Sequence, residues 1–140
     1  MTEASRGDAV GTPIGKRGGG VVGVHPDELG AGVIREVVVR NDLDPMAVDD
    51  VVFGCVDNVG PQAGDIARTA WLAAGLPEAI PGTTVDRQCG SGQQAVSFAA
   101  MGVMTGLQDL VVAGGVPNMR MIPIATALAA ARPPGPDDPF

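Results

Sequence analysis

Aromatic side chains are almost absent from this 140-residue chain. Phe and Trp together make up 3% of the residues, and there is no tyrosine. A hydrophobic core must therefore be built from Val, Ala, Leu, Ile and Met, within a hydrophobic content of 45%. That content excludes a chain that is disordered throughout, and the length suffices for one domain with its own core. The 21 glycines predict close packing of helices on a sheet.

Positive charge and cysteine are also scarce. Nine Lys and Arg residues stand against 16 Asp and Glu residues, which gives a net charge of −7, and the basic residues are scattered. A nucleic-acid surface needs a clustered basic footprint, so this class is excluded. Two cysteines make no disulfide framework. The N-terminal residues lack the basic and apolar regions of a signal peptide, so we expect a reducing, cytoplasmic compartment.

One long stretch without charge invites a membrane interpretation. Residues 88–108 contain no Asp, Glu, Lys or Arg. They do contain serines, glutamines, a threonine and four glycines, which makes the stretch too polar for a spanning helix. We therefore expect no membrane span, and a helix buried between protein layers accounts better for the missing charges.

Hydrophobic patterns along the chain alternate between the helical and the strand type. Prolines, glycines and Asn-Asp pairs separate the segments. The predicted helices span about 26–41, 65–74 and 91–105, and the predicted strands span 48–56, 83–85 and 110–115. This order predicts an α/β fold with a mixed, mostly parallel sheet packed by helices.

The two ends of the chain depart from this pattern. Residues 5–8 offer no apolar, β-branched side chain, so we expect the opening strand of the domain to be eroded. Residues 119–131 are apolar and alanine-rich, and residues 132–140 are too rich in proline for regular structure. We divide the chain into a domain over 1–123 and an apolar, then proline-rich, tail over 124–140.

The stretch from Thr83 to Ala95 is the strongest candidate for chemistry. It combines a short strand, a cysteine at position 89, a Gly-Ser-Gly turn and an apolar helix. The N-terminus of a helix favours negative charge, and a thiolate is the nucleophilic form of cysteine. The glycines permit a sharp reversal and close approach of a substrate, as in the nucleophile elbow of serine hydrolases. Cys89 is therefore the candidate acyl-accepting nucleophile.

Simpler explanations hold for the other reactive side chains. A lone cysteine is most often a small buried hydrophobic residue, and Cys55, inside an apolar run, is interpreted as a buried strand residue. The only histidine, His25, precedes Pro26 at a helix start. We interpret it as a solvated loop residue and not as a general base.

Six segments, in order and spacing, resemble the N-terminal half of a thiolase, the acyl-CoA C-acyltransferase family. The resemblance runs almost from end to end, although Gly11 stands where an arginine is usual and Pro117-Asn118 stand where Glu-Ser is usual. The matching segments are Thr12–Lys16 (TPIGK), Phe53–Val56 (FGCV), Pro61–Arg68 ending in IAR, Ala73–Pro77 (AAGLP), Cys89–Gly92 (CGSG) and Val112–Val116 (VAGGV).

The resemblance implies a reaction and a site. Cys89 would take the acyl group as a thioester, so acyl transfer would be ping-pong between CoA thioesters, by 3-ketoacyl-CoA thiolysis or by acyl-CoA condensation. The backbone N–H of Cys89 would be an oxyanion donor. CoA and acyl-CoA would be substrates, with no separate cofactor and no metal. The family fold is an αβαβα sandwich, of which this chain would form an incomplete part, and family members assemble as dimers or tetramers.

In the family, the activating histidine, a second cysteine and an asparagine come from the second half of the protein, to which nothing in this chain corresponds. We therefore expect the isolated 140-residue chain to be inactive. Two alternatives stay open. The chain could be a non-catalytic interaction module that docks on a full-length thiolase-like partner. It could also be another cysteine-dependent condensing enzyme, such as a ketoacyl synthase, although the CGSGQQ and TPIGK segments favour thiolase.

Overall fold

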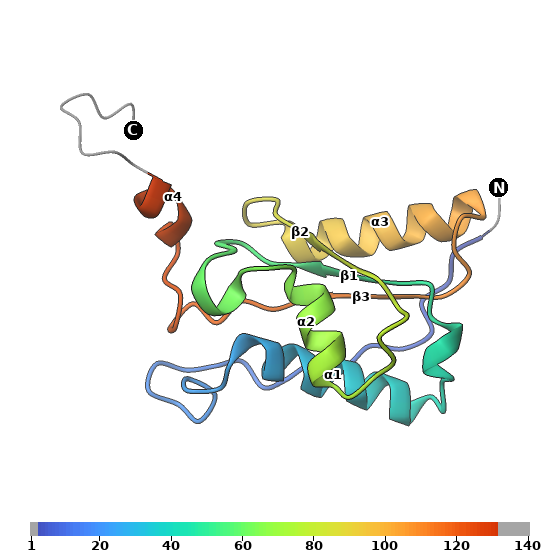
Figure 1. The fold of residues 1–140 in the computed structure, drawn as a ribbon, viewed down its shortest axis with the longest axis horizontal. Coiled ribbons are helices and arrows are strands. Elements are labelled where there is room, and N and C mark those ends of the chain that lie inside the picture. The colour runs from blue at the N-terminus through green and yellow to red at the C-terminus, as the bar shows by residue number, and fades with distance from the viewer. Residues whose placement is uncertain (1–2, 132–140) are drawn as a thin grey trace.

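A small parallel sheet forms the centre of the computed structural model, which describes residues 3–131 (Figure 1). The strands are β1 (Asp50–Gly54), β2 (Gly82–Val85) and β3 (Val111–Gly115), in the order β2-β1-β3. Val52 of β1 pairs in parallel with Thr83 on one side and with Ala113 on the other. The predicted α/β class is confirmed, and the sheet of the described residues is wholly parallel.

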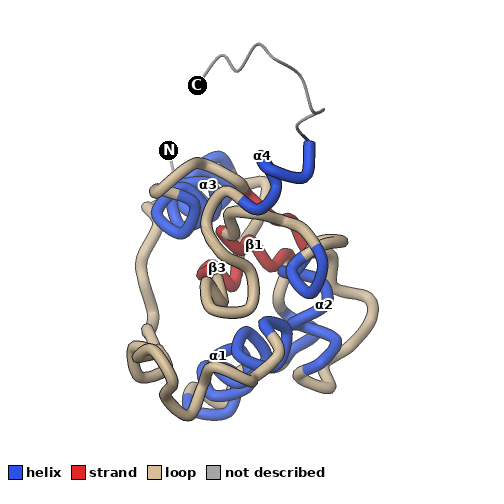
Figure 2. Tube along the Cα trace, turned by 90° about the vertical axis from the view of Figure 1, so that its left-hand side faces the viewer, coloured by secondary structure: helices blue, strands red, loops and turns tan. Residues whose placement is uncertain are grey.

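Helices cover both faces of the sheet. Figure 2 shows α3 (Ser91–Thr105) on one face and the pair α1 (Pro26–Arg40) and α2 (Ile66–Ala73) on the other. A fourth helix, α4 (Thr126–Ala131), follows β3, and two short 3-10 turns occupy Pro45–Ala47 and Gly60–Gln62. The described chain is therefore a three-layer α-β-α unit.

Side chains at the helix starts explain why α1 and α2 begin where they do. His25 accepts a hydrogen bond from the N–H of Asp27 at 3.3 Å, next to proline in the first turn of α1. Asp65 caps α2 through its carboxylate, which accepts from the N–H of Arg68 at 3.5 Å and from the hydroxyl of Thr84 at 2.7 Å. The second contact ties the start of α2 to β2.

The hydrophobic core lies between the sheet and the α1–α2 pair. Trp71 and Phe53 are its largest fully buried side chains, and aliphatic residues from both helices surround them. The indole N–H of Trp71 donates to the carbonyl of Pro77 at 2.8 Å, so its polar atom is satisfied. Arg35 of α1 donates to the carbonyls of Ala73 and Ala74 at the end of α2, where a cation complements the helix dipole.

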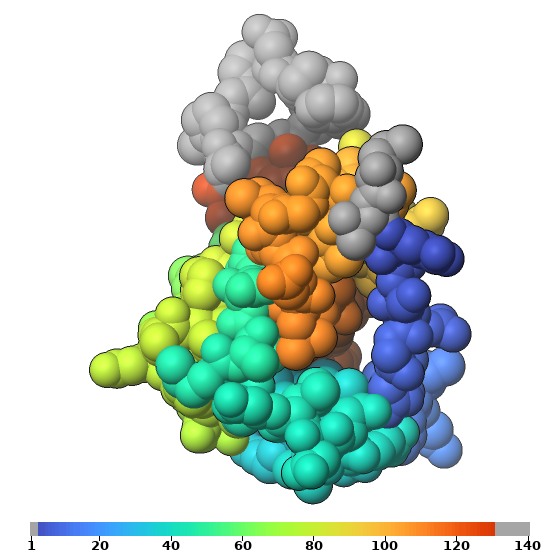
Figure 3. All heavy atoms as spheres, turned by 90° about the vertical axis from the view of Figure 1, so that its right-hand side faces the viewer, coloured from blue at the N-terminus to red at the C-terminus, as the bar shows by residue number. Residues whose placement is uncertain are grey.

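The N-terminal segment contains no strand within residues 3–25, and the erosion of an opening strand stays a prediction. In Figure 3 it follows the surface of the molecule as an extended blue stretch. Within this segment, residues 5–8 offer no apolar, β-branched side chain that could pack on the sheet.

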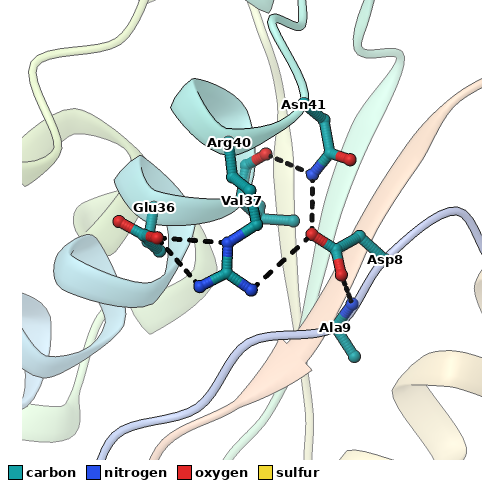
Figure 4. Close-up of polar contacts among 6 residues, drawn as sticks. All are labelled: Asp8, Ala9, Glu36, Val37, Arg40 and Asn41. Atoms are coloured by element: carbon teal, nitrogen blue, oxygen red, sulfur yellow. Dashed lines mark hydrogen bonds and ion pairs between the residues drawn. The ribbon is translucent and has the colours of Figure 1, made fainter.

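Polar contacts fix this segment to the end of α1 (Figure 4). Asp8 accepts hydrogen bonds from the side chain of Asn41 at 2.9 Å and from the N–H of Ala9 at 2.7 Å. Arg40 lies 3.9 Å from the Asp8 carboxylate and also pairs with Glu36 at 2.9 Å. The hydrogen bonds from Asn41 and Ala9, together with the charge of Arg40, hold the pKa of Asp8 below its ordinary value.

The segment that follows β3 is tied back to the loop that follows β1. Asn118 is buried, and its N–H donates to the side chain of Gln62 at 2.7 Å. The buried carboxylate of Asp57 accepts from the N–H groups of Ala125 and Ala127, each at 2.9 Å, and so holds the start of α4. The division of the chain at residue 123 stays a prediction, and the proline-rich stretch 132–140 lies outside the described residues.

None of the helices in the described part of the chain combines the length and the apolar character that a membrane crossing requires.

Candidate functional site

A tight turn between β2 and α3 presents Cys89. The N–H of Gly90 donates to the carbonyl of Arg87 at 2.7 Å and closes the turn. Ser91 reinforces it, because its hydroxyl donates to the Arg87 carbonyl at 2.9 Å and accepts from the Arg87 N–H at 3.0 Å. Inside this turn Cys89 has a φ of 59°. A left-handed conformation costs a non-glycine residue about 1–2 kcal/mol, so the turn holds the cysteine in a strained, exposed position.

The predicted helix after the cysteine is confirmed with its predicted bounds. Gly90 is the N-cap of α3 and offers no side-chain hydrogen bond to the first turn. Cys89 therefore lies beside a helix N-terminus that has no capping side chain, so the positive end of the helix dipole can act on a negative charge there. Within residues 3–131 the N–H of Cys89 has no hydrogen-bond acceptor.

Gly54, at the end of β1, lets α3 begin directly above the sheet. A Cβ atom at this position would overlap the backbone of Ser91 and Gly92. Gly115, at the end of β3, is equally restricted, since its Cβ would lie 2.7 Å from the carbonyl oxygen of Gly54. Gly54 therefore sets the height of the Cys89 turn above the strand ends, and Gly115 lets the end of β3 lie close to the end of β1.

A cavity of about 360 Å³ opens beside Cys89 at the C-terminal edge of the parallel strands. Ligand sites in open α/β sheets favour this edge, because the loops that follow the strands converge there. The cavity wall is formed by residues 54–56, 88–89 and 91–92, together with Gly115, Pro117, Met119 and Ile124.

Cys55 lies in the same cavity wall but differs from Cys89 in its surroundings. It directly follows β1, its exposed fraction is 1%, and its N–H donates to the carbonyl of Val85 at 3.0 Å. The burial predicted for Cys55 is confirmed, although β1 ends at Gly54, two residues before the predicted end of the strand. Burial, and then the carboxylates of Asp86 and Asp57, raise the pKa of the Cys55 thiol to about 11.

His25 is not part of this cavity. It caps α1, which lies on the face of the sheet opposite to α3, and its imidazole lies 3.4 Å from the carboxylate of Asp27. Residues 3–131 also contain no group of three or more His, Cys, Asp or Glu side chains that could hold a metal ion.

Several residues that shape the site escaped the sequence reasoning. Gly54 was seen only as part of a motif, and nothing in the sequence pointed to Asp57, Gln62 or Asn118 as anchors of the loops around the cavity. The signal that could have drawn attention to Gly54 is a glycine that ends a buried, β-branched run, since such a position often marks a close backbone approach.

Comparison with known proteins agrees with this architecture. The thiolase N-terminal domain family matches residues 8–133. A steroid 3-ketoacyl-CoA thiolase of Mycobacterium tuberculosis is 60% identical over 128 residues, which cover 91% of this chain and 31% of that protein. A β-ketoadipyl-CoA thiolase of Escherichia coli is 44% identical over 132 residues, which cover 94% of this chain and 33% of that protein.

Among solved structures, the acetyl-CoA acetyltransferase of Bacillus anthracis is similar, with a TM-score of 0.71 and 44% sequence identity. The match covers 78% of this chain and 27% of that one. The chain thus spans about a third of the length of the curated relatives that it matches. Through its N-terminal domain, the chain belongs to the thiolase family.

Proposed function

We propose that Cys89 is the acyl-accepting nucleophile of a thiolase-type acyl transfer between CoA thioesters. The observation that carries this proposal is the placement of one exposed thiol, at a φ of 59°, between β2 and the uncapped N-terminus of α3. The thiol of Cys89 would lose its proton and attack the acyl carbonyl, CoA would leave as the free thiol with that proton, and the acyl group would stay on the sulfur as a thioester. The N–H of Cys89, which has no acceptor within the described residues, supports its role as a donor to the developing oxyanion.

The substrate class follows from the relatives. By name, the relatives at 60% and 44% identity act on a steroid 3-ketoacyl-CoA and on β-ketoadipyl-CoA. We therefore assign a 3-ketoacyl-CoA to the thiolysis direction and two acyl-CoA molecules to the condensation direction, with CoA and acyl-CoA as substrates. The two free cysteines support assignment to a reducing compartment, the cytoplasm.

This chain alone should not turn over efficiently. General acid–base catalysis contributes about 10²- to 10⁴-fold, and the single histidine is engaged as the cap of α1 on the opposite face of the sheet. The chain should therefore accept an acyl group slowly and show no measurable thiolysis of acetoacetyl-CoA. A homo-oligomer or a thiolase-like partner subunit is the proposed context for full activity.

Intact-mass spectrometry after incubation with acetyl-CoA tests the nucleophile. The unchanged chain and a Cys55→Ala variant should each gain one acetyl group, and a Cys89→Ala variant should gain none. Acetylation of the Cys89→Ala chain, or none on the unchanged chain, would contradict the assignment. Measurable steady-state thiolysis by the pure chain would contradict the account of the missing acid–base groups.

A second candidate function is a non-catalytic module that docks on a thiolase-like partner. The outer face of α3 favours it, because apolar side chains along this helix are exposed, among them Val96 at 53% and Met101 at 48%. The acetylation experiment distinguishes the two functions. A docking module does not need a reactive Cys89, so it should gain no acetyl group.

A further inference from the structure

The wall of the Cys89 cavity carries no charged side chain among the described residues. Two of its polar side chains are already engaged within the turn. The amide of Gln88 donates to Asp86 at 3.0 Å, and the hydroxyl of Ser91 is held by the backbone of Arg87. The surfaces left to a substrate are therefore the glycine backbone at the strand ends, the two thiols, and apolar side chains.

The apolar part of the wall comes from the segment after β3. Met119 and Ile124 line the cavity and are 51% and 67% exposed. The contacts of Asp57 with the start of α4, and of Asn118 with Gln62, hold this segment beside the cavity. Exposed apolar side chains that border a cavity are available to contact an apolar ligand.

The charges that act on the Cys55 side of the cavity are negative, whereas on the Cys89 side the side chain of Arg87 packs against Gly90. The carboxylates of Asp86 and Asp57 are close enough to the Cys55 thiol to disfavour its anionic form. The nearest cluster of cations, Lys16, Arg17 and Arg120, lines a separate cavity of about 470 Å³. The two cavities share Pro117 and Met119 as a common wall, so these cations belong to the far side of that wall.

We infer that the Cys89 cavity selects an uncharged, apolar acyl group and rejects an acyl group that ends in a carboxylate. This inference rests on the proposed function, since it concerns the acyl group that Cys89 receives. A terminal carboxylate would lose water without gaining a cationic side chain from the wall. It would also meet the field of two carboxylates. An alkyl end would instead be covered by Met119 and Ile124.

The experiment compares two thioesters that differ only at the end of the acyl chain, hexanoyl-CoA and adipyl-CoA. A Cys55→Ala chain is used, so that only Cys89 reacts. In each case the bond from Cys89 sulfur to the acyl carbon forms, the bond from that carbon to CoA sulfur breaks, and CoA leaves as the free thiol with the proton from Cys89. Intact mass against time should show hexanoyl transfer faster by at least about tenfold. Equal rates would overturn the inference.

Two alkylating reagents keep the inference testable without any acyl transfer. Iodoacetamide is neutral and iodoacetate is anionic, and both alkylate a thiolate with loss of iodide. The iodoacetamide-to-iodoacetate rate ratio at Cys89 should exceed the same ratio for N-acetylcysteine. If neither thioester acylates Cys89, the proposed function fails, and the alkylation ratio alone then tests whether the cavity disfavours a carboxylate. A normal alkylation ratio with working acylation would overturn the inference alone.

Three substitutions that add or remove one positive charge test the inference at and away from the cavity wall. Met119→Lys adds a cation to the cavity and should raise adipyl transfer toward the hexanoyl rate. Met104→Lys adds the same charge near the far end of α3 and should change neither rate. Arg120→Gln removes a cation from the neighbouring cavity and should also leave both rates unchanged. A slower adipyl transfer after Arg120→Gln would show that the carboxylate reaches those cations, which contradicts the inference.

Discussion

Gly54 shows how one missing side chain sets the geometry of the candidate site. The N-terminal turn of α3 crosses β1 at this residue, and the backbone of Ser91 and Gly92 occupies the place of a Cβ atom. The backbone of Ser91 cannot move away easily, because the hydroxyl of Ser91 makes two hydrogen bonds with the backbone of Arg87. The cost of a larger residue at position 54 would thus appear directly at the turn that presents Cys89.

Gly54→Ala should therefore lower the free energy of unfolding by about 1–3 kcal/mol, the usual cost of overpacking. Gly32→Ala is the matched control, because Gly32 lies inside α1 with nothing within 4 Å of its added Cβ. It should raise stability by about 0.5–1 kcal/mol. Urea titration followed by the fluorescence of the single tryptophan measures both. Equal effects of the two substitutions would contradict the close approach of α3.

Cys55 gives the stability of the chain a defined alkaline limit. Its thiol has a pKa of about 11 in the folded chain against an ordinary value of 9.0, so the unfolded chain loses this proton first as the pH rises. The stabilisation is complete below about pH 9 and decreases through pH 11, where the loss reaches about 2 kcal/mol. Tyrosine is absent and Lys16 is the only lysine, so few other side chains titrate in this window. Urea midpoints at pH 8, 10 and 11 should fall for the unchanged chain and stay nearer to constant for Cys55→Ala.

At the scale of elements, the sequence predicted the helices and strands better than the contacts between them. The bounds of α3 follow from an apolar run between a glycine turn and Gly106, which are local signals. The left-handed conformation of Cys89 depends on how Ser91 folds back on Arg87, and the carboxylate of Asp57 acts on residues 68 and 70 positions away. Contacts over such separations leave no periodic pattern in the sequence. The position of the Cys89 thiol before α3 could therefore be predicted, but the contacts that hold the surrounding loops could not.

The two hydrogen bonds that Asp57 accepts at the start of α4 predict that this residue stabilises the segment 118–131. Asp57→Asn keeps a residue that tolerates a φ of 53°, but leaves one oxygen to accept from two N–H groups. Stability of the 118–131 segment should fall by about 1–2 kcal/mol. Trypsin should then cleave after Arg120 faster, as read by mass spectrometry. Asp42→Asn is the control, because Asp42 also has a positive φ, 49°, and is exposed. Equal cleavage of the two variants would contradict the anchoring role of Asp57.

At the scale of the whole molecule, the two faces of the sheet differ in how their helices are covered. The α1–α2 pair encloses the core, with Trp71 and Phe53 fully buried. Helix α3 turns only small residues toward the sheet, with Ser91, Ala95 and Gly102 buried. Its larger apolar side chains therefore stay outside, in a stretch that contains no charge. The absence of charge predicts a helix between two protein layers, and the described residues supply one of them.

An apolar helix face of this kind predicts association of the isolated chain. Phe98 and Met101 of α3 are 45% and 48% exposed, and Leu107, just beyond the helix, is 81% exposed. Because burial of such side chains is favourable by about 25 cal/mol per Å² of apolar surface, the chain should elute above the mass of a monomer, increasingly so at higher concentration.

A Phe98→Glu, Met101→Glu variant should shift toward the monomer, since two carboxylates on this face would have to be desolvated on association. Ile14→Glu is the control, because Ile14 is 99% exposed on the N-terminal segment, away from α3, and its replacement should leave the association unchanged. Size-exclusion chromatography with light scattering, over a range of protein concentrations, measures the mass of the eluted species for each variant. A monomer at every concentration, or equal effects of the two sets of substitutions, would show that the outer face of α3 does not drive association.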